Sequence, residues 1–517
     1  MSTSESRNYL VPVALVTCLF FLWAIGVNSN FVLLPHMQGA FGLNNMQAAI
    51  IDSAFFGAYF CAALPAGLII KKYGYKAAII VGLGLGALGA ILVTPAMNSI
   101  AFPAFLAAFF IFASGMGFLE TAANPLITEL GDKEGGARRL NFAQAFNGLG
   151  AVFTAAVIAG IIITSPKELE AEGKVMGAAL GITHTVEKTK LATFTKEGYE
   201  TVTELHSRWP EVSKKALDSM GPLDAARAFG AEPEVLLTAK AGGDIASKAL
   251  ADKILAEAAL KLEAADKLIA TGVIKRLGEH GGTVKTPFLI IAGVFILLAI
   301  VIGLTKFPDI KKLENEASGS HDGKGLWAHK WFSAGVLTLF FYVGGQICMG
   351  AFCIKYCLKE AGETEAVAVT VGLPMLIAFM VGRWVGTALM QKIPAWKVLA
   401  SFSFLAILPL IYIIAVGGPN GRTCLIVSEF FMSICFPTIF ALSIKDLGNR
   451  TEMASSALIM SIVGGAILPP MMGAMADSLS ATPDKMYQTI YIIPALCFAG
   501  VTVFSLCYRK LKPDEAA

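Results

Sequence analysis

The chain has 517 residues, of which 55% are hydrophobic and 15% are charged, and its mean hydropathy is +0.65. This composition excludes an ordinary soluble globular protein and indicates a membrane protein. The formal net charge of +3 carries little information by itself, and we expect no nucleic-acid partner.

Apolar stretches of about 18 or more residues recur along the whole chain, and each is long enough to cross a bilayer as a helix. The first stretch is too long for a cleavable signal peptide and lacks a small-residue cleavage site. We therefore predict an all-α membrane protein with twelve transmembrane helices. The predicted spans are 10–35, 45–70, 76–96, 101–129, 139–165, 286–307, 330–358, 364–391, 395–416, 421–445, 453–477 and 486–508.

Basic residues gather in alternate loops between these spans. The loops at 36–45, 97–100 and 416–420 contain no Lys or Arg. The positive-inside rule places basic loops in the cytoplasm, so we predict that both termini are cytoplasmic. The basic loops carry Lys71, Lys72 and Lys76; Arg138 and Arg139; Lys306, Lys311 and Lys312; Lys392 and Lys397; Lys445 and Arg450; and Arg509, Lys510 and Lys512.

About 120 mostly polar residues, 166–285, separate the fifth and sixth predicted spans. By the orientation above, this insertion lies outside the cytoplasm. Residues 245–275 are rich in good helix formers and carry apolar residues every four positions, which predicts an amphipathic helix. The insertion could be a helical cap, or it could gate a ligand or bind a partner. Its histidines are scattered and form no catalytic constellation, so we do not expect an enzyme.

The most informative stretch runs from 118 to 150. An apolar span carries Glu120, and an ionisable group inside a membrane helix is costly and usually faces an interior cavity. Asn124 and Pro125 interrupt this apolar run before a charged loop. The next span opens with three amides on nearly one helix face, and amides suit a polyhydroxylated ligand because each can donate and accept hydrogen bonds. These amides are Asn141, Gln144 and Asn147.

The two halves of the chain repeat weakly, which favours a transporter over a channel. Glu129-Leu-Gly131 and Asp446-Leu-Gly448 each close a span that contains a proline, Pro125 or Pro437. The predicted units are an N-terminal half with helices 1–5 (1–165), the insertion (166–285), helix 6 (286–308), a cytoplasmic linker (309–329) and a C-terminal half with helices 7–12 (330–517).

The nine cysteines all lie in predicted spans. We interpret them as small packing residues, because nothing suggests a disulfide framework and two nearby thiols alone make a poor metal site. We therefore expect no metal and no cofactor.

Longer motifs occur in both halves of the chain. They include Phe20-Phe-Leu-Trp-Ala24, Leu33-Leu-Pro35, Leu119-Glu-Thr-Ala-Ala-Asn-Pro125, Arg139-Leu-Asn141, Phe146-Asn147, Tyr342-Val-Gly344, Gly382-Arg383, Pro437-Thr-Ile-Phe440 and Leu447-Gly448. With these motifs the chain resembles the L-fucose permease branch of the major facilitator superfamily, the fucose–galactose–glucose:proton symporters, over nearly its whole length except 166–285.

The resemblance implies roles for several residues. Glu120 matches a glutamate associated with substrate binding and proton coupling, and Asn28 and Asn147 match amides of the sugar site. The family's acidic residue in span one falls at Phe31 in this chain, and a phenyl ring cannot take a proton. A tryptophan that the fucose permease carries in span seven falls at Gly350, which puts fucose itself in doubt.

A carboxylate in the second span offers a replacement for the missing acid. Asp52 lies where the fucose permease has a glutamine, and we hypothesise that the coupling acid has moved there from the position of Phe31. Burial and hydrogen bonding can together tune a cavity carboxyl toward ambient pH, as a proton carrier requires. A purely structural Asp52 remains the alternative.

Other side chains complete the predicted site. Trp23 and Phe31 could stack on a sugar ring, although most membrane aromatics are packing or interface residues, and Asn124 is a further expected substrate contact. Arg383 is a candidate gate or salt-bridge residue that needs a carboxylate or carbonyls. Glu429 is either a second site acid or a paired structural residue.

The resulting expectation is a bacterial inner-membrane sugar transporter that imports a monosaccharide by alternating access with the proton as coupling ion, and that functions as a monomer in the bilayer. An uncoupled facilitator or exchanger and a sodium-coupled symporter remain alternatives. The sugar itself stays open among hexoses, deoxyhexoses and N-acetylhexosamines.

Overall fold

The computed structural model describes residues 10–41, 45–98, 102–130, 134–158, 287–305, 325–479 and 485–512. The whole insertion (166–285), including the amphipathic stretch at 245–275, and most of the predicted linker (309–329) lie outside the described residues. Those predictions are therefore untested.

The described part of the chain is helical and contains no strand, so the predicted all-α class is confirmed. The first helices are α1 (Leu10–Phe41), α2 (Asn45–Tyr73), α3 (Tyr75–Asn98), α4 (Phe102–Glu129), α5 (Gly136–Phe153) with the π-helical turn η1 (Thr154–Ile158), and the helix Pro287–Leu304. The later helices are α14 (Lys330–Lys359), α15 (Glu365–Ala368), α16 (Gly372–Leu389), α17 (Ala395–Ala415), α18 (Gly421–Met432), α19 (Cys435–Ile444), α20 (Thr451–Met460), α21 (Gly464–Ser478), α22 (Met486–Thr489) and α23 (Ile492–Leu511); short 3-10 turns join some of them, η3 (Val369–Val371) before α16 and η5 (Ser461–Val463) before α21.

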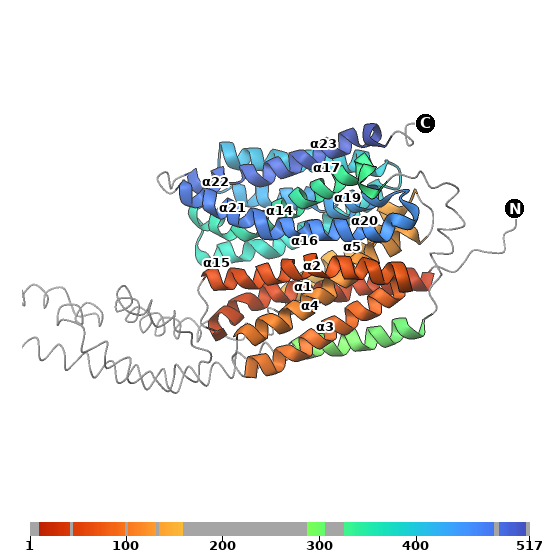
Figure 1. Cartoon of the computed structure of the whole chain (residues 1–517). Helices are drawn as coiled ribbons and strands as arrows, with labels where there is room; N and C mark the ends of the chain where they lie inside the picture. The colour runs from red at the N-terminus through yellow and green to blue at the C-terminus, as the bar shows by residue number, and fades with distance from the viewer. Residues whose placement is uncertain are drawn as a thin grey trace, which may run out of the picture.

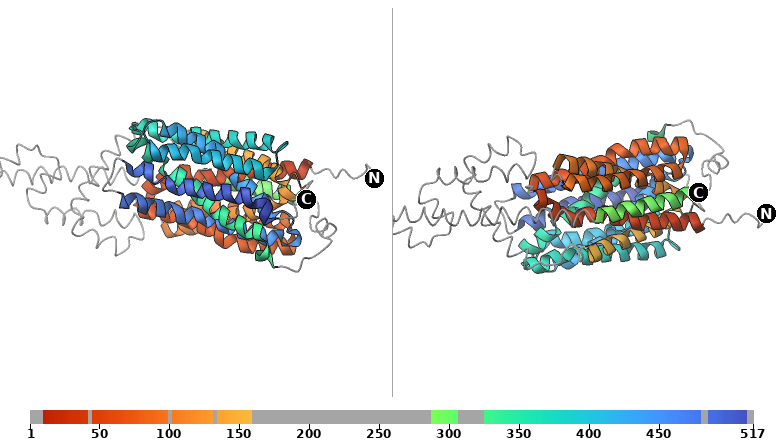
Figure 2. Two further views of the ribbon diagram at one scale, coloured as in Figure 1. Left: turned by 90° about the horizontal axis from the view of Figure 1, so that it is seen from above. Right: turned by 90° about the horizontal axis from the view of Figure 1, so that it is seen from below.

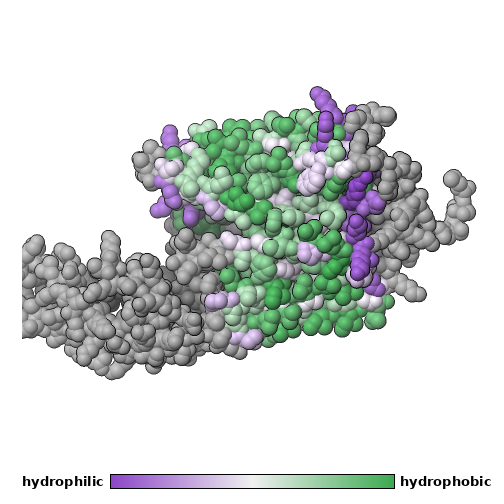
Figure 3. Space-filling view, viewed as in Figure 1, coloured by the Kyte–Doolittle hydropathy of each residue, from purple (hydrophilic) through white to green (hydrophobic). Residues whose placement is uncertain are grey.

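These helices agree closely with the predicted spans, because a chain inside a bilayer must satisfy its backbone groups internally. Among the described residues, eleven helical stretches are long and apolar enough to cross a membrane. The remaining predicted span is α5, whose first turns carry two arginines and several amides. On the face that Figure 3 shows, the described surface is largely apolar, with polar residues gathered toward its two ends.

The helices form two groups (Figure 1). In the N-terminal group α4 packs against α2 and α3, and α1 packs against α5. The helix Pro287–Leu304 joins this group, since Lys76 on α3 donates hydrogen bonds to the carbonyls of Gly303 (2.7 Å) and Thr305 (2.9 Å). In the C-terminal group, α14 and α17 pack against α23, and α16 and α17 pack against α18.

The first turn of α1 and the last turn of α23 lie at the same end of the bundle in all views (Figures 1 and 2). We call this end the terminal end. Contacts between the two groups gather toward it, where α5 packs against α16 and α2 against α20. At Gly67 on α2 the approach is so close that a Cβ would lie 2.0 Å from the hydroxyl of Ser456 on α20. The described helices therefore hold the groups together at the terminal end.

Two prolines inside spans have different consequences. α4 continues through Asn124 and Pro125 to Glu129, so the interruption of its apolar run does not end the helix. The predicted span 421–445, in contrast, divides into α18 and α19, with Ser433 and Ile434 between them. Pro437 lies just after this break. A proline lacks the N–H that would bond the carbonyl four residues earlier, and that carbonyl belongs to Ser433.

Candidate functional site

Glu120 lies on α4 in the interior of the bundle. Its side chain is 8% exposed, and the Asn124 side chain lies beside its carboxyl group. A buried carboxylate is costly in a low-dielectric interior and marks a functional position by default. Glu120 is therefore the centre from which the site is built.

Two aromatic side chains lie near Glu120. Trp23 on α1 is 2% exposed, and its indole N–H has no hydrogen-bond partner among the described residues. Tyr59 on α2 lies beside this indole and within electrostatic range of Glu120. The sequence analysis missed Tyr59, whose available signal was its position two turns after Asp52 on the same helix.

A layer of amides lies on the terminal side of Glu120. Asn124 follows Glu120 by one helical turn, or about 6 Å along the axis. Its side-chain oxygen accepts a hydrogen bond of 3.1 Å from the amide of Gln144 on α5. The amide nitrogen of Asn124 has no other partner among the described residues and lies beside the Glu120 carboxyl. Both amides are almost fully buried.

Arg383 on α16 connects this layer to the C-terminal group. Its guanidinium donates hydrogen bonds to the main-chain oxygen of Gln144 and, at 3.2 Å, to the side-chain oxygen of the same residue. Its Nε donates to the carbonyl of Ser433 at 2.9 Å. Arg383 and Glu120 also attract one another electrostatically. Of the two partners the sequence allowed for Arg383, the structure supplies carbonyls.

The carbonyl that Arg383 binds is the one that Pro437 leaves without an intrahelical donor. The preceding carbonyl, of Met432, accepts a hydrogen bond of 3.1 Å from the hydroxyl of Tyr342 on α14. Two side chains therefore take over the carbonyls at the α18–α19 break. On α4 the equivalent carbonyl, four residues before Pro125, is that of Thr121, and it accepts a hydrogen bond of 2.7 Å from Ser455 on α20.

Further polar contacts join the groups at the terminal end. The Asn141 side chain donates to the hydroxyl of Thr438 on α19 at 3.0 Å. Lys445 pairs with Glu134 at 3.3 Å, in an exposed position. Asn141 was predicted as part of an amide face that recognises a ligand. In this conformation it bonds across the groups instead.

Among the described residues, the other two predicted amides make no hydrogen bond between the two groups. Asn147 is half-buried and makes a long hydrogen bond of 3.5 Å to the carbonyl of Phe20. Asn28 is also half-buried, and its amide bonds the carbonyl of Ala24 on its own helix at 2.8 Å. Both can therefore turn to a ligand without breaking a contact between the groups.

The C-terminal group contributes a second wall. Glu429 on α18 is 8% exposed, has no hydrogen-bond partner among the described residues, and lies near Tyr342 and Cys353 on α14. Gln346 and Gly350 lie one turn apart on the same helix, α14. A Cβ at Gly350 would meet no atom within 4 Å, and Gln346 is half-buried. The sequence analysis missed Gln346.

The side chains of Phe31 and Asp52 lie outside the described residues, although α1 and α2 contain these positions. Their predicted roles are untested. Among the residues whose side chains are described, no group of three or more metal-ligating side chains occurs. The site thus consists of a buried carboxylate, amides and aromatic rings, which is the donor–acceptor set that a polyhydroxylated ligand requires.

Comparison with known proteins places this arrangement in a family. Residues 16–167 match the Major Facilitator Superfamily model. The chain is 34% identical to the L-fucose-proton symporter of Escherichia coli (strain K12), covering 97% of this chain and 94% of that protein. It is 29% identical to a glucose/galactose transporter of Brucella abortus biovar 1 (strain 9-941), covering 98% and 96%.

A crystal structure of the Escherichia coli fucose:proton symporter has the same fold, with a TM-score of 0.66 at 32% identity over 97% of this chain and 99% of that one. A second structure of this transporter, in the outward conformation, matches equally well. Sequence and fold agree along nearly the whole length. The chain belongs to the major facilitator superfamily, in the L-fucose permease family of sugar:proton symporters.

Proposed function

We propose that this chain is a symporter that imports a monosaccharide together with protons by alternating access. The observation that carries the proposal is Glu120, a carboxylate buried in the interior of the bundle near an indole, a phenol and a layer of amides. The names of the relatives, an L-fucose-proton symporter and glucose/galactose transporters, support the same substrate class.

In this proposal the sugar lies between the two groups, on the side of Glu120 away from the terminal end. Asn28 and Asn147 bond its hydroxyls, and Trp23 supplies an apolar ring face. Phe31 is a further candidate for stacking. Asn124 and Gln144 belong to the network of Arg383 in this conformation, so they are proposed to contact the sugar only as that network rearranges.

Proton coupling follows from charge. An empty site with an ionised Glu120 carries an unpaired charge, whereas a protonated Glu120 that bonds a sugar hydroxyl does not, and the second form crosses the occluded state at lower cost. Coupling requires that proton and sugar favour the same conformations, not that either binds tightly. We propose Asp52 as the second coupling acid, in place of the acid missing at Phe31, and Glu429 as a carboxylate that the sugar reaches from the C-terminal group.

The terminal end is proposed to be cytoplasmic, in line with its basic loops. The conformation described here is then closed to the cytoplasm, with Arg383 as the gate residue. The insertion at 166–285 would lie outside the cytoplasm. We place the protein in a bacterial inner membrane, where it would act as a monomer.

The test is uptake of a panel of labelled sugars by proteoliposomes, with and without an imposed pH gradient. Accumulation that a protonophore abolishes would support the symporter. Equilibration without accumulation, indifferent to pH, would indicate an uncoupled facilitator or exchanger. Accumulation that depends on a sodium gradient would indicate sodium, and not the proton, as the coupling ion. No transport of any sugar would overturn the proposal.

Two variants separate binding from coupling. We expect Glu120→Gln to lose accumulation, because the amide cannot carry the proton, while retaining part of its sugar exchange. We expect Asp52→Asn to behave in the same way if the coupling acid has moved to α2. Undiminished accumulation by Asp52→Asn would contradict that role and leave the coupling to Glu120 alone.

A further inference from the structure

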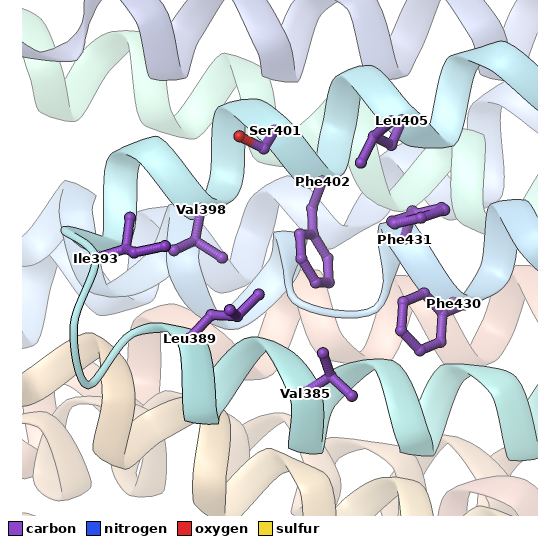
Figure 4. Close-up of a pocket in the computed structure, with 9 residues that line it drawn as sticks. All are labelled: Val385, Leu389, Ile393, Val398, Ser401, Phe402, Leu405, Phe430 and Phe431. Carbon is purple, nitrogen blue, oxygen red and sulfur yellow. The ribbon is translucent and has the colours of Figure 1, made fainter.

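An apolar groove of about 340 Å³ lies on the C-terminal group (Figure 4). Side chains of α16, of α17, of the turn between them and of the end of α18 line it, and the hydroxyl of Ser401 is the one polar group among these side chains. Val398 and Phe402 are almost fully buried and form its floor, whereas Val385, Leu389 and Ile393 are 38–39% exposed at its edge.

The groove opens outward within helices long and apolar enough to cross a membrane. Any molecule bound in the groove would therefore face the hydrocarbon of the bilayer along the edge formed by Val385 and Leu389. An extended acyl chain fits this setting, because it matches the apolar lining and leaves no polar group unsatisfied.

One end of the groove is basic. Ile393 and Val398 line that end, and each adjoins an exposed lysine, Lys392 or Lys397. Lys397 lies over the ring of Trp396 at 5.4 Å, and tryptophan favours the membrane–water interface. The sequence contains no Asp or Glu between residues 366 and 428, so no acidic residue of this segment offsets the two lysines.

We propose that this groove binds an anionic phospholipid, with one acyl chain along Leu389 and Phe402 and the phosphate at Lys392 and Lys397. The far end of the groove is formed by Phe430 and Phe431, which lie in the last turn of α18, before the α18–α19 break. At Gly382 on α16, a Cβ would lie 2.1 Å from the carbonyl oxygen of Phe430. The lipid thus supports from outside the same break that Arg383 holds from inside.

The experiment uses the full-length protein in nanodiscs that contain equal amounts of phosphatidylglycerol and phosphatidylethanolamine. Native mass spectrometry then identifies the lipids retained on the protein. We expect wild type to retain phosphatidylglycerol in preference, and Lys392→Gln and Lys397→Gln each to lower this preference by about fivefold. Lys72→Gln is the matched control, since Lys72 is an exposed basic residue beside an aromatic ring in the N-terminal group.

A second variant tests the acyl site separately. Ser401→Trp fills the groove from its exposed rim and leaves both lysines in place, so it should abolish retention of the lipid. In wild type, phosphatidylglycerol should also slow hydrogen exchange at 430–435 relative to phosphatidylethanolamine. Equal retention of both lipids by wild type, full retention by Ser401→Trp, or a lipid-free dimer in which a second copy covers the groove would each overturn the proposal.

Discussion

Pro125 in the N-terminal group and Pro437 in the C-terminal group each lie in the fourth predicted span of their half of the chain, yet they produce different structures. Each leaves one carbonyl without its intrahelical donor. On α4 the carbonyl of Thr121 accepts from the neutral hydroxyl of Ser455, and the helix continues. Beyond α18 the carbonyl of Ser433 accepts from the charged Arg383, and the helix breaks.

The difference indicates that the two groups have different roles in transport. The N-terminal group holds its binding groups on continuous helices, which suits a site that must keep its shape. The C-terminal group places a cation at a helix break, where a small movement of α16 or α19 changes which carbonyls and amides that cation reaches. Because Arg383 also bonds Gln144 across the groups, we infer that the C-terminal break does most of the closing.

Removing the guanidinium of Arg383 should therefore cause the largest loss of uptake. Arg383→Ala leaves the buried oxygens of Ser433 and Gln144 without their charged donor, at a cost of about 3 kcal/mol in the closed state, or roughly 100-fold in its population. Initial uptake in proteoliposomes should fall correspondingly. Arg383→Lys should restore little, since one ammonium cannot reproduce the two-sided geometry of a guanidinium.

The matched control is Arg422, an arginine of the same group whose carboxylate pair is only partly buried. Arg422 lies 3.4 Å from Glu363, and pairs that remain accessible to solvent contribute about 0–1 kcal/mol. Arg422→Ala should therefore change uptake by about fivefold at most. Uptake by Arg383→Ala within the range of this control would contradict the gate assigned to Arg383.

Restoring the missing N–H should have an intermediate effect. In Pro437→Ala the amide of residue 437 can bond the carbonyl of Ser433 and compete with Arg383, so α18 and α19 should tend to merge. We expect uptake to fall about tenfold, the equivalent of one charged hydrogen bond of roughly 1.5 kcal/mol. Hydrogen exchange at 433–438 should slow, because the new bond protects the backbone.

The same substitution on the other proline sharpens the comparison. Pro125→Ala should change uptake little, because α4 is already continuous and Ser455 can share the carbonyl of Thr121. Pro409→Ala, inside α17, controls for the loss of a proline within a helix of the C-terminal group. Equal effects of Pro125→Ala and Pro437→Ala would show that the two prolines do not differ in function.

The sequence predicted the fold well because hydropathy reports the membrane directly. Spans such as 395–416 and 421–445 ended within a residue of the helical stretches observed. It also drew attention to both prolines and to Arg383. The sequence alone does not predict that Arg383 donates a hydrogen bond to the carbonyl left without a donor by Pro437, because that pairing depends on how α16 packs against α18.

The site was predicted only in part, for a similar reason. Glu120 is conspicuous because a carboxylate is rare inside a membrane helix. Tyr59 and Gln346 are not, since a tyrosine or a single glutamine in a span also fits packing. The packing of α1, α2 and α4 brings Tyr59 close to Trp23 and Glu120, and this packing cannot be read from the sequence of α2 alone.

The smallest effect on the closed state is expected from removing the neutral hydrogen bond between Ser455 and the carbonyl of Thr121. Ser455 is fully buried, and its hydroxyl bonds Thr121 across the groups. Ser455→Ala leaves that carbonyl without its donor only while the terminal end is closed. A neutral hydrogen bond contributes about 1 kcal/mol, so the population of the closed state should fall about fivefold. Hydrogen exchange at 445–456 should rise accordingly.

Ser505→Ala is the control for this last variant, because the Ser505 hydroxyl is equally buried but bonds its own helix at the carbonyl of Val501 (2.8 Å). It should leave exchange at 445–456 unchanged. If Ser455→Ala opened the terminal end as far as Arg383→Ala does, the neutral and the charged contact would be equivalent. The N-terminal proline would then belong to the gate as much as the C-terminal one, and the two halves would close the protein symmetrically.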